Sequence, residues 1–97
     1  MNTYITLMKL TDQGAKGLKE APKRVEDALK VFDQMGGKLI GFYATQGEYD
    51  YIGIGEASSD ENATAFSLAL SSLGNVRTTT IRAFTLKEFA EMVKKLP

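Results

Sequence analysis

Proton-transfer chemistry in this chain has to come from carboxylates, lysines and tyrosines. The 97 residues include no histidine and no cysteine, which excludes imidazole catalysis, thiolate nucleophiles and metal or haem bound through these residues. Three candidate groups stand together as Glu48, Tyr49 and Asp50 in the segment GEYDYIGIGEA, residues 47–57. Either carboxylate would need a raised pKa to act as a base near neutral pH. We expect no metal and no cofactor.

Charge and composition exclude several kinds of partner. Twelve Lys and Arg balance twelve Asp and Glu, and the isoelectric point is about 6.2, so no overall field attracts nucleic acid or an anionic membrane. No apolar run approaches the roughly 20 residues of a membrane span, and the chain starts with an alternating pattern rather than a signal peptide. The sequence therefore predicts a cytoplasmic protein that binds neither nucleic acid nor membrane.

The elements that must position Glu48, Tyr49 and Asp50 follow from periodicity. Alternating or β-branched runs predict strands over 3–10, 38–45, 47–57 and 76–84, with a hairpin turn at 46–47. Residues 11–21 break the first strand's pattern with two glycines. Apolar residues at helical spacing predict a helix that starts near Pro22 and stops at Gly36-Gly37.

Two capping boxes predict the remaining helices. Ser58 with Glu61 starts a helix that ends at 74–75, and Thr85 with Glu88 starts a short terminal helix. The order strand, helix, strand, strand, helix, strand and terminal helix predicts a single α+β domain over 1–97 with the ferredoxin-like βαββαβ fold. Right-handed crossovers place the first and third strands at the centre of a four-stranded antiparallel sheet, with both main helices on one face.

The second face of this sheet would be left uncovered. If Ile52 and Ile54 point toward the helices, alternation places the tyrosines and glycines of the third strand on the uncovered face, beside Tyr4, Thr6 and Met8. Such a patch is too apolar for water and predicts at least a dimer. The glycines would let a second surface approach or would shape a cavity; the alternative is a bulge. The candidates for the dimer face are Tyr4, Met8, Tyr51, Gly53 and Gly55.

Three distant segments should meet at one end of the sheet, namely 11–14, 46–50 and 74–78, with the start of the first main helix nearby. This places charges of both signs together, from Asp12, Gln13, Glu48, Asp50, Lys23, Arg24 and Arg77. We interpret Asp50 as a carboxylate that accepts from backbone N–H groups or pairs with Arg77, the alternative being a side chain that faces a ligand.

Four motifs in this order carry a resemblance: TDQG, PKR, GEYD as G-x-Y-D, and SLGNVRTTTIRAFT with a following Glu. Across nearly the whole chain, they resemble the GYD domain family of small bacterial and archaeal proteins. The resemblance implies a ferredoxin-like domain related to dimeric α/β-barrel proteins and brings no catalytic residues. It marks the motif positions as candidate ligand-binding residues, together with the adjacent Glu48: Asp12, Gly14, Gly47, Glu48, Tyr49, Asp50 and Arg77.

Three functions compete. We favour a small-molecule binding or sensing module that works as a homodimer or higher homo-oligomer, with tyrosines and glycines shaping the cavity. The second is a pure assembly module. The third is a cofactor-independent enzyme with Asp50 or Glu48 as base and Tyr49 as donor, by resemblance to monooxygenases and isomerases with the dimeric α/β-barrel architecture.

Overall fold

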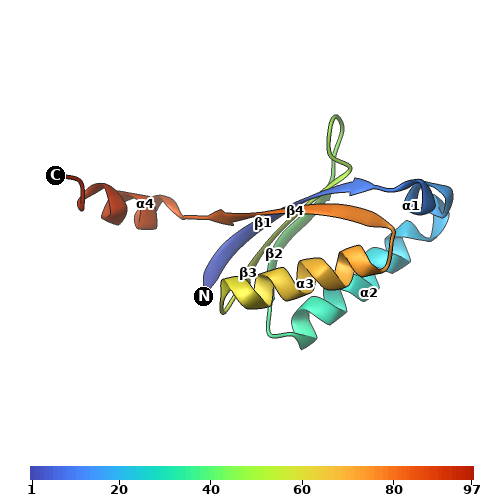
Figure 1. Cartoon of the computed structure of the whole chain (residues 1–97), viewed down its shortest axis with the longest axis horizontal. Helices are drawn as coiled ribbons and strands as arrows, with labels where there is room; N and C mark the ends of the chain where they lie inside the picture. The colour runs from blue at the N-terminus through green and yellow to red at the C-terminus, as the bar shows by residue number, and fades with distance from the viewer.

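The computed structural model describes residues 1–97 as one antiparallel sheet, helices on one of its faces and a terminal helix beyond its edge (Figure 1). The strands are β1 (Asn2–Leu10), β2 (Lys38–Ala44), β3 (Tyr51–Ala57) and β4 (Val76–Ala83). The helices are α1 (Asp12–Lys16), the 3-10 helix η1 (Leu18–Glu20), α2 (Ala21–Gln34), α3 (Asp60–Ser72) and α4 (Leu86–Val93). No helix has the length and apolar character needed to cross a membrane.

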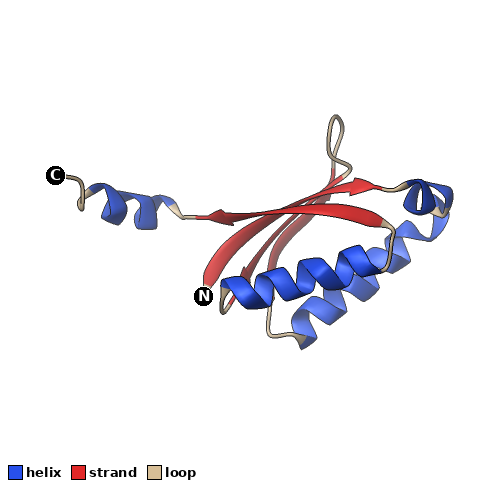
Figure 2. Cartoon of the chain, in the orientation of Figure 1, coloured by secondary structure: helices blue, strands red, loops and turns tan.

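The strand order is β2-β3-β1-β4, and every neighbouring pair is antiparallel. β1 and β3 are therefore central, and α2 and α3 lie on the same face of the sheet (Figure 2). This confirms the predicted ferredoxin-like α+β fold. The 11–21 segment, where the sequence indicated only a break, contains α1 and η1.

The helix ends show which local signals were correct. At α4 the predicted capping box is complete, with Thr85 and Glu88 each accepting a hydrogen bond from the other's backbone N–H. At α3 the prediction was off by one residue, because Ser59 rather than Ser58 caps the helix by accepting from Asn62 N–H. α3 ends before Gly74, whose φ of 82° favours glycine.

The predicted direction of the strand side chains was wrong. Tyr4 and Met8 are only 8% and 6% exposed and face α2 and α3. Gly55 lies on the same side, since a Cβ there would lie 2.9 Å from the Phe32 ring of α2. With Tyr51 and Gly53 also beneath the helices, the five residues expected on the dimer face belong to the covered face.

The uncovered face carries aliphatic side chains instead. Alternation places Ile5 and Leu7 of β1 there, and each has an isoleucine directly across the β1/β3 pair, Ile54 and Ile52. Ile81 of β4 stands opposite Ile5 on the other side and is 45% exposed. Both faces of the central strands are therefore apolar, and only one is covered by helices.

Helix α4 extends beyond the sheet at the far end of β4 and touches neither α2 nor α3 (Figure 1). The chain consequently has a longest dimension of 52 Å against a shortest of 19 Å. The apolar residues of α4 lie in water, with Leu86 82% and Phe89 56% exposed. Nothing in the same chain covers this helix.

Candidate functional site

Asp50 attaches the β2–β3 hairpin to the end of β1. Its backbone N–H donates to the Met8 carbonyl over 2.9 Å, which extends the β1/β3 ladder by one bond. The ladder then ends, and the Asp50 carboxylate accepts the next N–H, that of Leu10, over 2.8 Å. The side chain thus replaces a missing strand partner, which confirms the interpretation of Asp50 as a carboxylate bound by backbone donors.

Arg77 does not pair with Asp50, contrary to our expectation. It is exposed, stands opposite Lys9 in the β1/β4 register and forms no ion pair. Because Lys9 shares the odd-numbered positions of β1 with Ile5 and Leu7, Arg77 belongs to the uncovered face. Two cations therefore lie side by side at this end of that face.

The predicted meeting of the 11–14 and 74–78 segments is confirmed. The Thr11 hydroxyl donates to the Gly74 carbonyl, and the Thr11 N–H donates to the Asn75 carbonyl over 3.0 Å. A Cβ on Gly14 would lie 2.1 Å from the same Asn75 oxygen, so only glycine allows the two backbones this close. Gln13 adds hydrogen bonds to this segment, whereas Asp12 is exposed and makes no ion pair.

The hairpin loop carries the remaining motif residues at the surface. Gly47 has a φ of 97°, which a side chain would disfavour. Glu48 lies 3.4 Å from Lys9 Nζ, and this ammonium sits 5.4 Å from the centre of the Tyr49 ring. No hydrogen bond joins Glu48, Tyr49 and Asp50 side chains to one another. The loop therefore shows no paired base and donor, and its motif residues shape and attach the hairpin.

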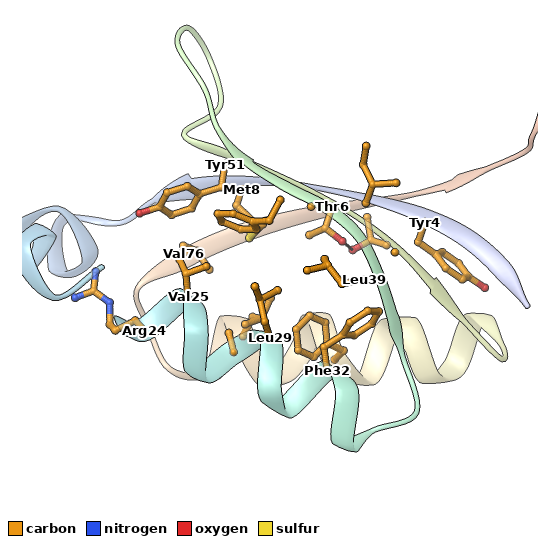
Figure 3. Close-up of a pocket in the computed structure, with 18 of the residues that line it drawn as sticks. Tyr4, Thr6, Met8, Arg24, Val25, Leu29, Phe32, Leu39, Tyr51 and Val76 are labelled. Atoms are coloured by element: carbon orange, nitrogen blue, oxygen red, sulfur yellow. Dashed lines mark hydrogen bonds between the residues drawn. The ribbon is translucent and has the colours of Figure 1, made fainter. Parts of the chain in front are cut away.

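A cavity of about 110 Å³ lies between the sheet and the two helices (Figure 3). Its wall is mostly apolar, since 18 of the 24 residues that line it are hydrophobic. Tyr51, Met8 and Gly53 contribute from the sheet, and Leu29 and Phe32 contribute from α2. We expected a cavity lined by tyrosines and glycines between two copies; the structure has it within one chain.

Polar groups occur at both ends of this cavity. At one end the Arg24 guanidinium donates to the Gly17 carbonyl over 2.6 Å and to the Gly14 carbonyl over 3.1 Å. Toward the other end the Tyr4 hydroxyl donates to the Asp60 carboxylate at the start of α3. Burial raises the pKa of Tyr4, and the hydrogen bond to Asp60 raises it further. Sequence reasoning missed this bond, because no local pattern links residues 56 positions apart.

No group of three or more Asp or Glu side chains is placed to hold a metal ion. The fold and its surfaces define a small ferredoxin-like α+β domain with an open apolar sheet face and a cavity beneath the sheet. The chain belongs to the GYD domain family, whose model matches residues 4–93. The G-x-Y-D residues of this chain are Gly47, Tyr49 and Asp50, the three that form and anchor the hairpin.

A curated relative from Thermus thermophilus is named "Glutamine synthetase and cystathionine beta-lyase binding protein". It is 30% identical to this chain over 95 residues, which cover 97% of this chain and 100% of the relative. The similarity therefore includes both the sheet and α4. No solved structure matches the chain.

Proposed function

We propose that this chain is a protein-binding module that works as a homo-oligomer and binds an enzyme of amino-acid metabolism. The observation that carries the proposal is the full-length similarity to a relative named for binding glutamine synthetase and cystathionine beta-lyase. The absence of a paired base and donor in the hairpin loop agrees with a role in binding rather than in catalysis. The partner would be one of these two enzymes from the same organism.

The uncovered face supports assembly with a second copy of the chain. Ile5, Ile54 and Ile81 form a row across three strands, and their burial against an identical row would remove apolar surface from water. Two such sheets pack about 10 Å apart, with side chains interdigitating. The exposed apolar residues of α4 would also be removed from water if they packed on the second copy.

Binding to the two enzymes is directly measurable. We expect the purified chain to form a complex with glutamine synthetase or cystathionine beta-lyase from its own organism in sedimentation-velocity experiments at micromolar concentration. A metabolic enzyme of similar size and charge provides the control. If neither enzyme shifts in sedimentation coefficient while the chain itself is folded, the proposed partner class is wrong.

Small-molecule binding is a second candidate function, favoured by the cavity beneath the sheet. The cavity is apolar and has polar groups at its ends, which is the usual lining of ligand sites in proteins. This function is compatible with the first, since a bound molecule could alter the surface that meets the enzyme.

A further inference from the structure

We propose that the cavity beneath the sheet binds a small apolar molecule with one carboxylate, which the Arg24 guanidinium holds. This inference rests on the second candidate function above and names the class of ligand. It is carried by three features of the cavity: its size and lining, the space above Gly53, and the guanidinium at its end.

The size of the cavity restricts the ligand. Its volume is about 110 Å³, somewhat smaller than the roughly 150 Å³ engineered apolar cavity that stays dry and binds benzene. One aromatic ring or a short branched chain is therefore the largest apolar body that fits without movement of the walls. The wall also offers rings as partners, since Phe32 and Phe66 pack in a tilted arrangement with ring centres 4.8 Å apart, and Tyr51 packs against Phe42 with ring centres 5.4 Å apart.

The two glycines of β3 differ in what they make room for. Gly55 is required by the chain's own packing, because a Cβ there would lie 2.9 Å from the Phe32 ring. A Cβ on Gly53 would lie 3.6 Å from Met8 Cε and 3.8 Å from Phe42 Cδ2, which are ordinary contacts. Glycine weakens a strand interior, yet nothing in the chain requires it at position 53. We infer that the space above Gly53 accommodates another molecule.

Arg24 supplies the only charge on the cavity wall. It forms no ion pair, and its two hydrogen bonds go to the neutral carbonyls of Gly17 and Gly14. A guanidinium has five N–H donors in one plane, so donors remain for a carboxylate, which matches this group in geometry and charge. Figure 3 shows the guanidinium and the Tyr51 hydroxyl at the same end of the cavity.

The Tyr51 hydroxyl is a second available donor at this end. It makes no hydrogen bond within the chain, whereas the Tyr4 hydroxyl at the far end is already bonded to Asp60. A ligand would therefore place its carboxylate toward Arg24 and Tyr51 and its apolar body toward Phe32 and Gly53. The orientation follows from where unsatisfied donors lie.

The test compares phenylacetate with its neutral amide, phenylacetamide, by calorimetry and ligand-detected NMR on the full chain. We expect phenylacetate to bind at least about tenfold more tightly, the difference expected for one charge-assisted hydrogen bond. Arg24→Gln should bring the two affinities together, whereas Lys23→Gln, an exposed neighbour on α2, should leave the difference unchanged.

Filling the cavity is the complementary test. Gly53→Val should abolish binding of both probes, and Gly53→Ala, whose Cβ makes only ordinary contacts, should weaken both if the larger variant does not fold. Equal affinity for the two probes, unaffected by Arg24→Gln, would overturn the carboxylate assignment and leave small-molecule binding in place. No binding of either probe to the unaltered chain at millimolar concentration would overturn both. The enzyme-binding function is tested independently.

Discussion

The carboxylate of Asp50 accepts a hydrogen bond from the backbone N–H of Leu10 over 2.8 Å, 40 residues away in the sequence. We predict that Asp50→Ala lowers the free energy of unfolding by about 1–3 kcal/mol, because the part-buried N–H loses a charged acceptor. Asp50→Asn keeps an acceptor oxygen and should cost less. Urea unfolding measures both losses, and Asp12→Ala provides an exposed control. Unchanged stability in Asp50→Ala would mean that the hairpin is not anchored through this bond.

Arg77 should act independently of Asp50. The two side chains form no ion pair, and Arg77 stands beside Lys9 on the uncovered face. The double variant Asp50→Ala with Arg77→Ala should therefore lose the sum of the single losses, within about 0.3–0.5 kcal/mol. A coupling energy above about 1 kcal/mol from the same urea series would show a direct interaction that the structure lacks.

The order of elements could be predicted because their local signals agree. Alternating or β-branched runs marked the strands, and Thr85 with Glu88 marked the start of α4. Once the topology was set, the meeting of the 11–14 and 74–78 segments at one sheet end followed from strand direction alone. The role of Asp50 could then be predicted, because a carboxylate beside the end of a strand ladder lies close to a backbone N–H group that has no strand partner.

Alternation alone could not predict which side chains of β1 and β3 point toward the helices. Tyr4 and Met8 alternate with Ile5 and Leu7, so either set suits a core, and a one-residue choice exchanges the two faces. The deciding contact is tertiary: the Phe32 ring of α2 needs the space that Gly55 leaves. The wrong choice of face also led us to expect the cavity between two copies, whereas it lies within one chain.

Gly55 and Gly53 should respond oppositely to alanine. Gly55→Ala would place a Cβ 2.9 Å from the Phe32 ring and 3.2 Å from the Lys38 carbonyl, and we predict a loss of about 1–3 kcal/mol from overpacking. Gly53→Ala meets only ordinary contacts, so removal of glycine's flexibility should stabilise the chain by up to about 0.5–1 kcal/mol. Thermal unfolding of the two variants, measured side by side, gives the sign of each change in stability. A comparable loss in both would contradict the distinction between the glycines.

The uncovered face should carry the contact between copies. We predict that Ile54→Glu dissociates the oligomer, because a buried unpaired carboxylate between two sheets is costly. Thr64→Glu, on an exposed position of α3, is the matched control and should leave assembly unchanged. Sedimentation equilibrium measures the oligomeric state of both variants. A chain that is monomeric at micromolar concentration before any substitution would remove the basis for this assignment.

Helix α4 should lose its first turn as pH falls. The hydrogen bond from the Thr85 backbone N–H lowers the pKa of Glu88, with a smaller contribution in the same direction from Arg82. A carboxylate with a lowered folded-state pKa stabilises the helix above its unfolded pKa, and this contribution disappears as pH falls through the folded pKa. We expect the amide protection factors of residues 86–89, which are corrected for the intrinsic pH dependence of exchange, to fall over that acidic range. Glu88→Gln keeps a capping acceptor but does not titrate, so its α4 exchange should not show the acidic transition. The same loss of protection in Glu88→Gln would assign the transition to another group.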